Sequence, residues 1–282
     1  MSIWANHAHV FPAETRPEGT VEELLRLMDE CEIERAVAFA PFGRIKQLDI
    51  DQNTWLYDQI KTRSDRLIGF GTIDMSAGNY GSQVDHIKEL GFPGIKLHPA
   101  AQRFHILSEP LLEVYSRAEE ADLFLVFHTG VHWHRLLDFR LVEFDEIAYR
   151  FPRLRFSLEH VGGYAFFHEA IAVIQNNSLR QHPGGKGTVY AGLTSVFSPE
   201  APHWYLPPSK IEELIFLVGE NRVIFGLDFP YNSAAYIRHA IDTIRHLNIS
   251  QSAVERILGG NLRQLLGYAS DEAVGSPSLT GT

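Results

Sequence analysis

Eight short apolar runs recur along the 282 residues of this chain, and they constrain its fold more than any other feature of the sequence. Each run is about five to seven residues long and rich in Val, Ile, Leu or Phe, which is typical of strands buried on both faces of a parallel sheet. The predicted strands are Ile3–His9, Arg35–Pro41, Leu67–Ile73, Gly94–His98, Leu123–His128, Leu154–His160, Thr188–Thr194 and Arg222–Asp228.

Segments with helical periodicity separate these runs, and the first begins at Thr20 with the capping-box pattern Thr-Val-Glu-Glu. Strand–helix alternation predicts right-handed parallel crossovers, and eight such units fit a single-domain, distorted (β/α)8 TIM-type barrel. The rival is a doubly wound sheet, which usually carries a glycine-rich loop where this chain has His-Ala-His-Val-Phe-Pro. We expect residues 1–269 to form the barrel and residues 270–282, rich in Ser, Gly and Thr, to form a flexible tail.

Composition narrows the class of protein. The net charge is −10 and no long basic run is present, so a nucleic-acid partner is not expected. The single cysteine excludes an internal disulfide framework. No apolar stretch has the length of a membrane span and no leader is visible, so we expect a cytoplasmic enzyme with a small-molecule substrate. Barrels of this kind often dimerise, and a homodimer stays an option.

The predicted barrel supplies a filter for function, because active sites lie at the carboxyl ends of barrel strands. The first strand ends in His7-Ala-His9, and side chains two residues apart point to the same face of a strand. Two imidazoles aimed into one barrel mouth can chelate a cation. The plainer interpretation is a pair of surface histidines at the start of a loop.

Three further polar residues close apolar strands. His128 ends the fifth strand, His160 ends the sixth before a Gly-Gly pair, and Asp228 ends the eighth. A satisfied core histidine or a helix cap would explain each one separately. Taken together with the first strand, they indicate a metal centre, because buried imidazoles and a carboxylate need a polar partner.

The predicted ligands are His7, His9, His128 and Asp228. Three nitrogens and one carboxylate oxygen suit one divalent metal, Zn²⁺ before Mn²⁺, Fe²⁺ or Co²⁺, with room for water. The fourth strand adds Lys96, whose amine, if carboxylated, can bridge to a second metal. Lys96 can also bind a substrate anion as a point charge, or pair with an interior acid.

Weaker candidates for substrate binding lie at or just after strand ends. Lys96 and His98 share one face of the fourth strand, and Arg44 and Arg103 follow the second and fourth strands. Exposed arginines usually have no specific role. His132 and His134 follow the fifth strand and Trp204 and Tyr205 the seventh, either as pocket walls or as ordinary loop residues.

The pattern of these segments resembles the amidohydrolase superfamily, and within it the amidohydrolase-2 branch of aminocarboxymuconate semialdehyde decarboxylase-like proteins. The matching segments run in family order along nearly the whole chain: His7-Ala-His9-Val-Phe-Pro, Gly94-Ile-Lys-Leu-His-Pro, Phe127-His128-Thr-Gly, Glu159-His160-Val-Gly-Gly, Phe225-Gly-Leu-Asp228-Phe-Pro and Ile257-Leu-Gly-Gly-Asn-Leu-Arg. This framework is specific to the superfamily but not to one reaction.

The resemblance implies a distorted (β/α)8 barrel with a divalent metal at its mouth. Carried over by position, His160 matches the histidine that orients the attacking water or the substrate, and it is itself a ligand in binuclear members. Two positions depart from the family pattern: Ala5 stands where an acid is frequent, and Glu159 where a small or apolar residue is frequent. Both departures change the groups that surround the ligands.

Metal-assisted hydrolysis of an amide, ester or lactone is the leading hypothesis, with Asp228 as the proton shuttle and His160 steadying the water. The alternative is a non-oxidative decarboxylase, which would place anion-binding side chains such as Lys96, Arg44 or Arg103 beside the metal. A third hypothesis is a barrel that binds a small molecule without turnover, and the complete ligand set argues against it.

Overall fold

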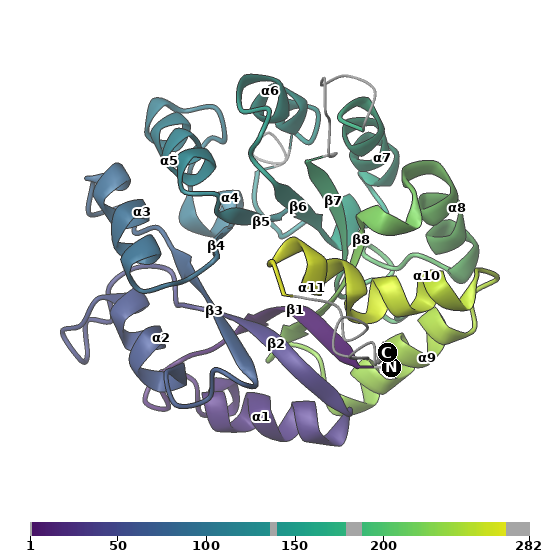
Figure 1. Cartoon of the computed structure of the whole chain (residues 1–282), viewed down its shortest axis with the longest axis horizontal. Helices are drawn as coiled ribbons and strands as arrows, with labels where there is room; N and C mark the ends of the chain where they lie inside the picture. Colours follow the sequence, from purple (N-terminus) through teal and green to yellow (C-terminus); the bar gives the residue numbers. More distant parts are fainter. Residues whose placement is uncertain (1, 136–139, 179–187, 269–282) are drawn as a thin grey trace, which may run out of the picture.

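The computed structural model describes residues 2–135, 140–178 and 188–268. Within these ranges, eight parallel strands pair in chain order and close into a barrel through β8 and β1 (Figure 1). The (β/α)8 prediction is therefore confirmed. The strands are β1 (Ile3–His9), β2 (Ile33–Phe39), β3 (Leu67–Thr72), β4 (Gly94–Leu97), β5 (Phe124–His128), β6 (Phe156–Glu159), β7 (Val189–Leu193) and β8 (Val223–Phe229).

Helices surround the strands as an outer layer (Figure 1). The longer ones are α1 (Val21–Glu30), α2 (Gln52–Ile60), α3 (Tyr80–Glu89), α5 (Glu109–Glu120), α6 (Glu143–Arg150), α7 (Phe167–Asn176), α8 (Pro208–Val218) and α9 (Ala234–Arg245). At the start of α1, the Thr20 hydroxyl accepts a hydrogen bond from the amide of Glu23, as the capping pattern predicts. The described helices include none that is long and apolar enough to cross a membrane.

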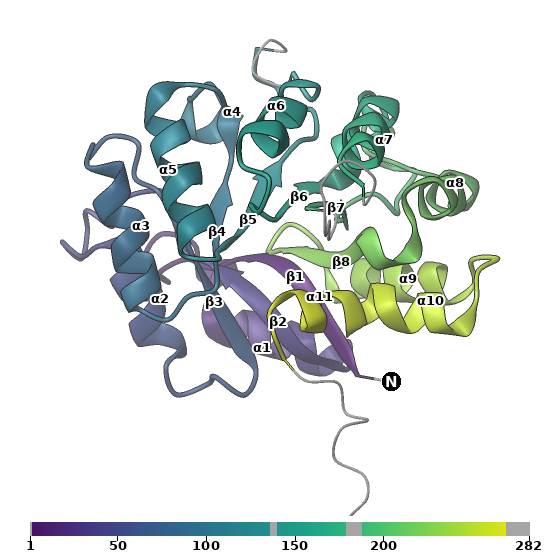
Figure 2. The same ribbon diagram turned by 45° about the horizontal axis from the view of Figure 1, so that its top comes forward.

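Three short α-helices are α4 (Pro99–Gln102), α10 (Gln251–Glu255) and α11 (Asn261–Leu265). Short 3-10 helices lie at Pro17–Gly19, His160–Gly162 and Glu220–Arg222, and a π-helix at Arg256–Gly260 joins α10 to α11. Figure 2 shows α11 beside β1, close to the amino end of the barrel. The predicted tail at 270–282 lies outside the described residues.

The sequence prediction carried five strands one or two residues too far: β2, β3, β4, β6 and β7 end at Phe39, Thr72, Leu97, Glu159 and Leu193. The structure shows the cause at β4 and β6. β4 ends at Leu97, and His98 instead forms the N-cap of α4, where its ring nitrogen accepts a hydrogen bond from Ala101. β6 ends at Glu159, because His160 turns into a left-handed backbone conformation and begins a short 3-10 turn. Both strands end earlier than their apolar runs suggest because a local turn replaces the ladder of strand hydrogen bonds.

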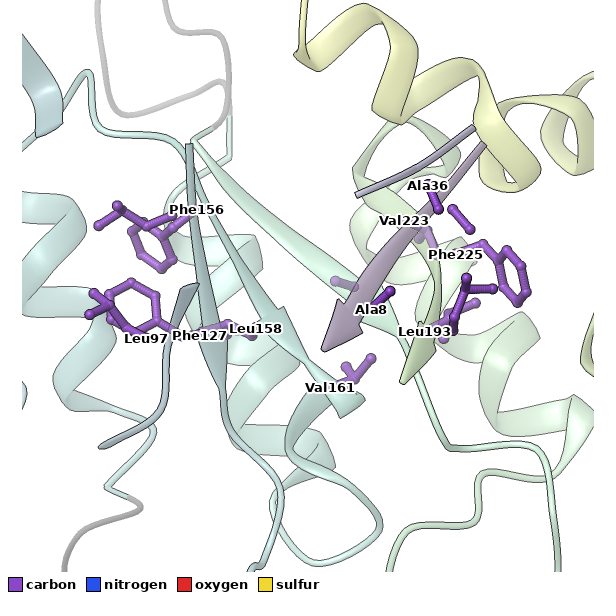
Figure 3. Close-up of a cluster of buried hydrophobic side chains, with 14 of the residues drawn as sticks. Ala8, Ala36, Leu97, Phe127, Phe156, Leu158, Val161, Leu193, Val223 and Phe225 are labelled. Carbon is purple, nitrogen blue, oxygen red and sulfur yellow. The ribbon is translucent and has the colours of Figure 1, made fainter. Parts of the chain in front are cut away.

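Alternate residues of the strands form two apolar layers, as the period of a strand requires. Within β5, Phe124 and Val126 belong to a small cluster that includes Phe39 and Phe70 inside the barrel. The side chains of the other parity, which include Phe127, belong to the larger cluster between strands and helices (Figure 3). The barrel interior is therefore a packed core at its amino end, and polar groups begin only toward the carboxyl ends of the strands.

Candidate metal centre and cavity

A cavity of about 440 Å³ lies at the carboxyl ends of the barrel strands. Its lining includes His7, His9 and Asp228, which β1 and β8 bring together from opposite ends of the chain. His128 and His160 from β5 and the turn after β6 also line it. The site histidines and the aspartate predicted from strand ends are thus gathered in one cavity.

The three donor atoms of His7, His9 and Asp228 all lie within 4.8 Å of one another. The distance from His7 Nε2 is 3.2 Å to His9 Nε2 and 3.4 Å to Asp228 Oδ1. Zinc–nitrogen bonds of about 2.0–2.1 Å place tetrahedral ligand atoms about 3.4 Å apart. The spacing therefore fits ligands that share one divalent cation.

The proton on His7 is fixed by Glu159. His7 Nδ1 donates to Glu159 Oε2 at 2.8 Å, so the lone pair of His7 lies on Nε2 and faces the Asp228 carboxylate oxygen. A lone pair facing a carboxylate oxygen is repulsive unless a cation or a proton lies between them. The donor set and its tautomer therefore fit a metal ion, and Lys96 Nζ, 3.2 Å from His7 Nε2, is a cation that the protein itself places there.

An unusual backbone conformation sets the direction of four side chains at the site. His7, His160, Ser195 and Asp228 have φ values of 67°, 62°, 57° and 54°, in the left-handed region that residues other than glycine rarely adopt. The pairing of β1 also shifts register around His7, which marks a bulge. Each such residue costs about 1–3 kcal/mol, and such strain clusters at functional sites.

Glu159 is the anchor beneath the metal-binding group and is 0% exposed. Besides His7, its carboxylate accepts hydrogen bonds from Asn6 Nδ2 at 3.0 Å, from Thr194 Oγ1 at 2.7 Å and from the Ser157 hydroxyl. Burial raises the pKa of Glu159, and the Lys96 charge and these hydrogen bonds oppose that rise. The sequence shows this residue only as a departure from the family pattern, and its partners become visible in the folded chain.

His128 and His160 form a second pair. His128 Nε2 donates to the carbonyl of Gly130 and His160 Nδ1 donates to the carbonyl of Thr194, both at 2.8 Å. Their remaining ring nitrogens therefore face each other as acceptors, 3.1 Å apart. The ring centroids of His160 and His7 are 5.3 Å apart, so the two groups adjoin. Within the described chain, the clustered donor atoms come from His7, His9 and Asp228. His128 lies outside this cluster and contacts the ring of His160, at a centroid distance of 4.7 Å.

Lys96 is 0% exposed and lies beneath the cavity rather than in its lining. Its Nζ is 3.2 Å from His7 Nε2 and 5.3 Å from the centre of the Phe39 ring. Burial lowers the pKa of Lys96 to about 8, and the charges of Glu159 and Asp228 oppose the shift. A buried cation with so low a pKa lies beside the metal-binding group without facing the substrate space.

Electrostatics prepare the site for a cation. Burial holds the pKa values of His7, His9, His128 and His160 well below their usual range, so these imidazoles are neutral near pH 7. Burial raises the pKa of Asp228 to about 6, opposed by the hydrogen bond that the Ser195 hydroxyl donates to Oδ2 at 2.6 Å. Neutral imidazoles and an ionisable carboxylate are the protonation states that a metal requires.

The weaker candidates for substrate binding divide into residues that line the cavity and residues that do not. His98 and His132 line the cavity, and so does Trp204, whose ring lies 3.9 Å from that of His160. Arg44 instead pairs with Asp49 on the surface. Arg103 is the C-cap of α4 and, like Arg44, lies within the described ranges but outside the cavity lining.

Ser195 and Asn232 were missed by the sequence analysis. Asn232 donates to Ser195 Oγ at 2.9 Å, and Ser195 in turn donates to Asp228. Ser195 directly follows the end of the seventh predicted strand, so the rule of strand ends contained the signal needed to find it.

Fold and site together define a (β/α)8 barrel with a His/Asp group suited to a divalent metal at the carboxyl ends of its strands. The sequence model of the family described as Amidohydrolase matches residues 6–268. The chain therefore belongs to the amidohydrolase family, as its motifs suggested.

Solved structures with this fold include enzymes named for different reactions. One is a 5-carboxyvanillate decarboxylase from Sphingomonas paucimobilis, with 15% identity, 95% and 99% coverage of this chain and that one, and a TM-score of 0.73. Another is a dihydroxybenzoic acid decarboxylase from Polaromonas sp. JS666 with bound manganese, with 15% identity, 94% and 96% coverage, and a TM-score of 0.68. A third is a candidate 2-pyrone-4,6-dicarboxylic acid hydrolase from Pseudomonas putida, with 16% identity, 96% and 99% coverage, and a TM-score of 0.69. At these identities the likeness shows the fold.

Proposed function

We propose that this protein is a metal-dependent hydrolase that cleaves an amide, ester or lactone bond of a small organic substrate. The observation that carries the proposal is the convergence of His7 Nε2, His9 Nε2 and an Asp228 oxygen in the cavity. Nitrogen and carboxylate ligands suit Zn²⁺ first, and Mn²⁺, Fe²⁺ or Co²⁺ as well. A manganese ion bound in a neighbour of the same fold is consistent with this range.

His7, His9 and Asp228 would hold one metal, with His128, the fourth ligand predicted from the sequence, in the lining of the same cavity. A second metal on a carboxylated Lys96 is less favoured, because Lys96 Nζ lies against His7 and the Phe39 ring rather than facing the cavity. When bound, the metal would lower the pKa of water from about 15.7 to about 7 and polarise a carbonyl oxygen.

Two residues of the chain would move and steer the proton. Asp228, with a pKa of about 6, is suited to take a proton from the attacking water near neutral pH and to return it to the leaving group. Ser195 holds one oxygen of this carboxylate and so fixes its direction. His160, with its proton held by Thr194, presents Nε2 as an acceptor that would orient the water.

Decarboxylation is the second candidate, because two of the solved structures of this fold carry that activity in their names. That reaction was expected to need cationic side chains beside the metal. Arg44 is paired with Asp49, and Arg44 and Arg103, both described, lie outside the cavity lining. Lys96 does lie beside the metal-binding group but is absent from the cavity lining, so these positions favour hydrolysis over decarboxylation.

Isotope labelling separates the two reactions. Metal-free protein reloaded with Zn²⁺ or Mn²⁺ would be incubated with esters, lactones and aromatic acids in water enriched in oxygen-18. Hydrolysis places the oxygen-18 label in the product acid. Release of CO2 with no label in the organic product would overturn the proposal.

The Asp228→Asn variant tests the proton shuttle, and its metal content would be measured in parallel. We expect kcat to fall by about 10²–10⁴-fold at matched metal content, because Asn cannot accept the proton. Glu169→Asn on the exposed face of α7 is a matched control that should leave kcat unchanged. A full-rate Asp228→Asn enzyme would contradict the assignment.

A further inference from the structure

His98 is a buried hydrogen-bond donor that the described protein leaves without a partner. Its Nδ1 accepts a hydrogen bond from the amide of Ala101 at 3.2 Å, so the proton of the neutral ring lies on Nε2. The residue is 6% exposed and lines the cavity, and Nε2 has no hydrogen-bond partner among the described residues. Because this N–H group has no acceptor in the described protein and His98 lines the cavity, it can donate to a ligand bound there.

Neighbouring rings hold the imidazole of His98 in place. It stacks on His128 with ring centroids 3.8 Å apart and an interplanar angle of 10°. Phe42 stands perpendicular to it at 6.0 Å, and His132 meets it at 4.8 Å. Stacking and the contact with Ala101 together fix the direction of the N–H group before any ligand arrives.

The cavity presents flat apolar surfaces around this donor. The rings of Trp204, Phe42 and Tyr231 line the cavity, and each is held against a histidine ring, Trp204 against His128 and the other two against His9. Fixed aromatic walls favour a planar ligand that packs against them.

The described lining of the cavity is poor in positive charge. Of the described residues that line the cavity, none is Arg or Lys. Arg16 lies over the Tyr231 ring at 4.5 Å, but its Nε is paired with Glu18. A substrate carboxylate held away from the metal ligands would therefore be desolvated without a compensating cation.

We propose that the cavity selects an uncharged, planar aryl ester or lactone, and that His98 Nε2 donates a hydrogen bond to an oxygen of this substrate. The inference rests on the proposed hydrolase function and names its substrate class. In the reaction, water adds across the ester: the bond between the acyl carbon and the aryl oxygen breaks. The acid receives the hydroxyl group and the phenol receives the proton.

A matched pair of esters tests the charge preference. Methyl 4-acetoxybenzoate and 4-acetoxybenzoate share the same aryl acetate bond and differ by one remote carboxylate. With the metal-loaded full chain, we expect kcat/KM for the methyl ester to be higher by at least about tenfold after correction for spontaneous hydrolysis. Equal or faster turnover of the acid would overturn the proposal.

The His98→Asn variant tests the donor, because Asn at an N-cap still accepts the hydrogen bond that begins α4. We expect KM for the methyl ester to rise by about fivefold to tenfold with little change in kcat, as for the loss of one uniform hydrogen bond. Melting temperature and bound metal should match the wild type. His134→Asn, outside the cavity lining, is the histidine control.

Product binding distinguishes failure of this inference from failure of the hydrolase proposal. Calorimetry would compare methyl 4-hydroxybenzoate with 4-hydroxybenzoate on wild type and His98→Asn, without any turnover. Tighter binding of the neutral phenol, weakened by His98→Asn, supports the substrate class even if neither ester is cleaved, an outcome that would refute the hydrolase alone. Tighter binding of the acid, or no effect of His98→Asn on binding and KM, overturns the inference.

Discussion

Replacing Glu159 by Gln should weaken metal binding while leaving the fold intact. The carboxylate receives four donors in two pairs: Asn6 and Ser157 on Oε1, and His7 and Thr194 on Oε2. Gln has the same shape, but its amide group offers hydrogens at one of the two positions. Whichever way the amide turns, its NH2 group meets the N–H donor of either Asn6 or His7. Even where its oxygen faces His7, the hydrogen bond loses the charge of the carboxylate, so His7 is held less firmly.

The magnitude follows from the lost bond between Glu159 and His7. A hydrogen bond to a charged group contributes about 1.5–3 kcal/mol, and about 1.4 kcal/mol corresponds to a tenfold change in an equilibrium constant. Removing a carboxylate that orients a ligating histidine typically costs 10–100-fold in metal affinity. We therefore expect the Kd for Zn²⁺ to rise by about 10- to 100-fold in Glu159→Gln.

The assay would be competition for Zn²⁺ with a chromophoric chelator, followed by Co²⁺ substitution to compare the visible absorption bands. Glu169→Gln on the exposed face of α7 provides a matched control that should bind metal as the wild type does. Thermal unfolding of both metal-free variants separates a local effect from a general loss of stability. A Kd within about twofold of the wild type, in a folded Glu159→Gln protein, would refute the positioning role.

Three further predictions concern the same group. Metal affinity should fall about tenfold per pH unit below pH 6, because Asp228 with a pKa of about 6 must lose its proton before it can bind metal. Titrations from pH 5 to 7, below the pKa of about 8 of Lys96, would show this. The Lys96→Met variant should still bind about one equivalent of metal, and should bind it more tightly, because the buried ammonium beside His7 repels a cation. If elemental analysis instead found that the variant had lost its metal, Lys96 would be a ligand. Gly192→Ala should lower stability by about 1–3 kcal/mol and weaken metal binding, because its new Cβ would lie 2.5 Å from the carboxyl carbon of Glu159; an unchanged denaturation midpoint would contradict this.

The barrel was predictable because local sequence patterns indicate both which segments are buried strands and in what order they follow one another. Apolar runs of strand length, separated by helical periodicity, leave few architectures open. The ends of β4 and β6 were less accessible, since they depend on how His98 and His160 use their backbone and ring nitrogens. Apolar content alone does not reveal where a ladder of hydrogen bonds gives way to a turn.

The site was predictable where residues end strands, and less so where contacts join distant strands. His7, His9 and Asp228 were expected to meet because parallel strands share one carboxyl edge, and the structure places them together. The role of Glu159 was hidden, because its partners come from β1, β6 and the end of β7. The direction of His98 was also hidden, since it depends on a single contact with the amide of Ala101.

The left-handed backbone at His7, His160, Ser195 and Asp228 has an evolutionary consequence. Glycine, and to a lesser degree asparagine, adopts this conformation more readily than most side chains. Substitutions to such residues would relax the backbone while erasing the chemistry, so relief of strain at these four positions works against keeping the site. Purifying selection on activity, rather than on folding, must then maintain the four side chains. Regaining the site would require restoring the strained conformations and the ligands together.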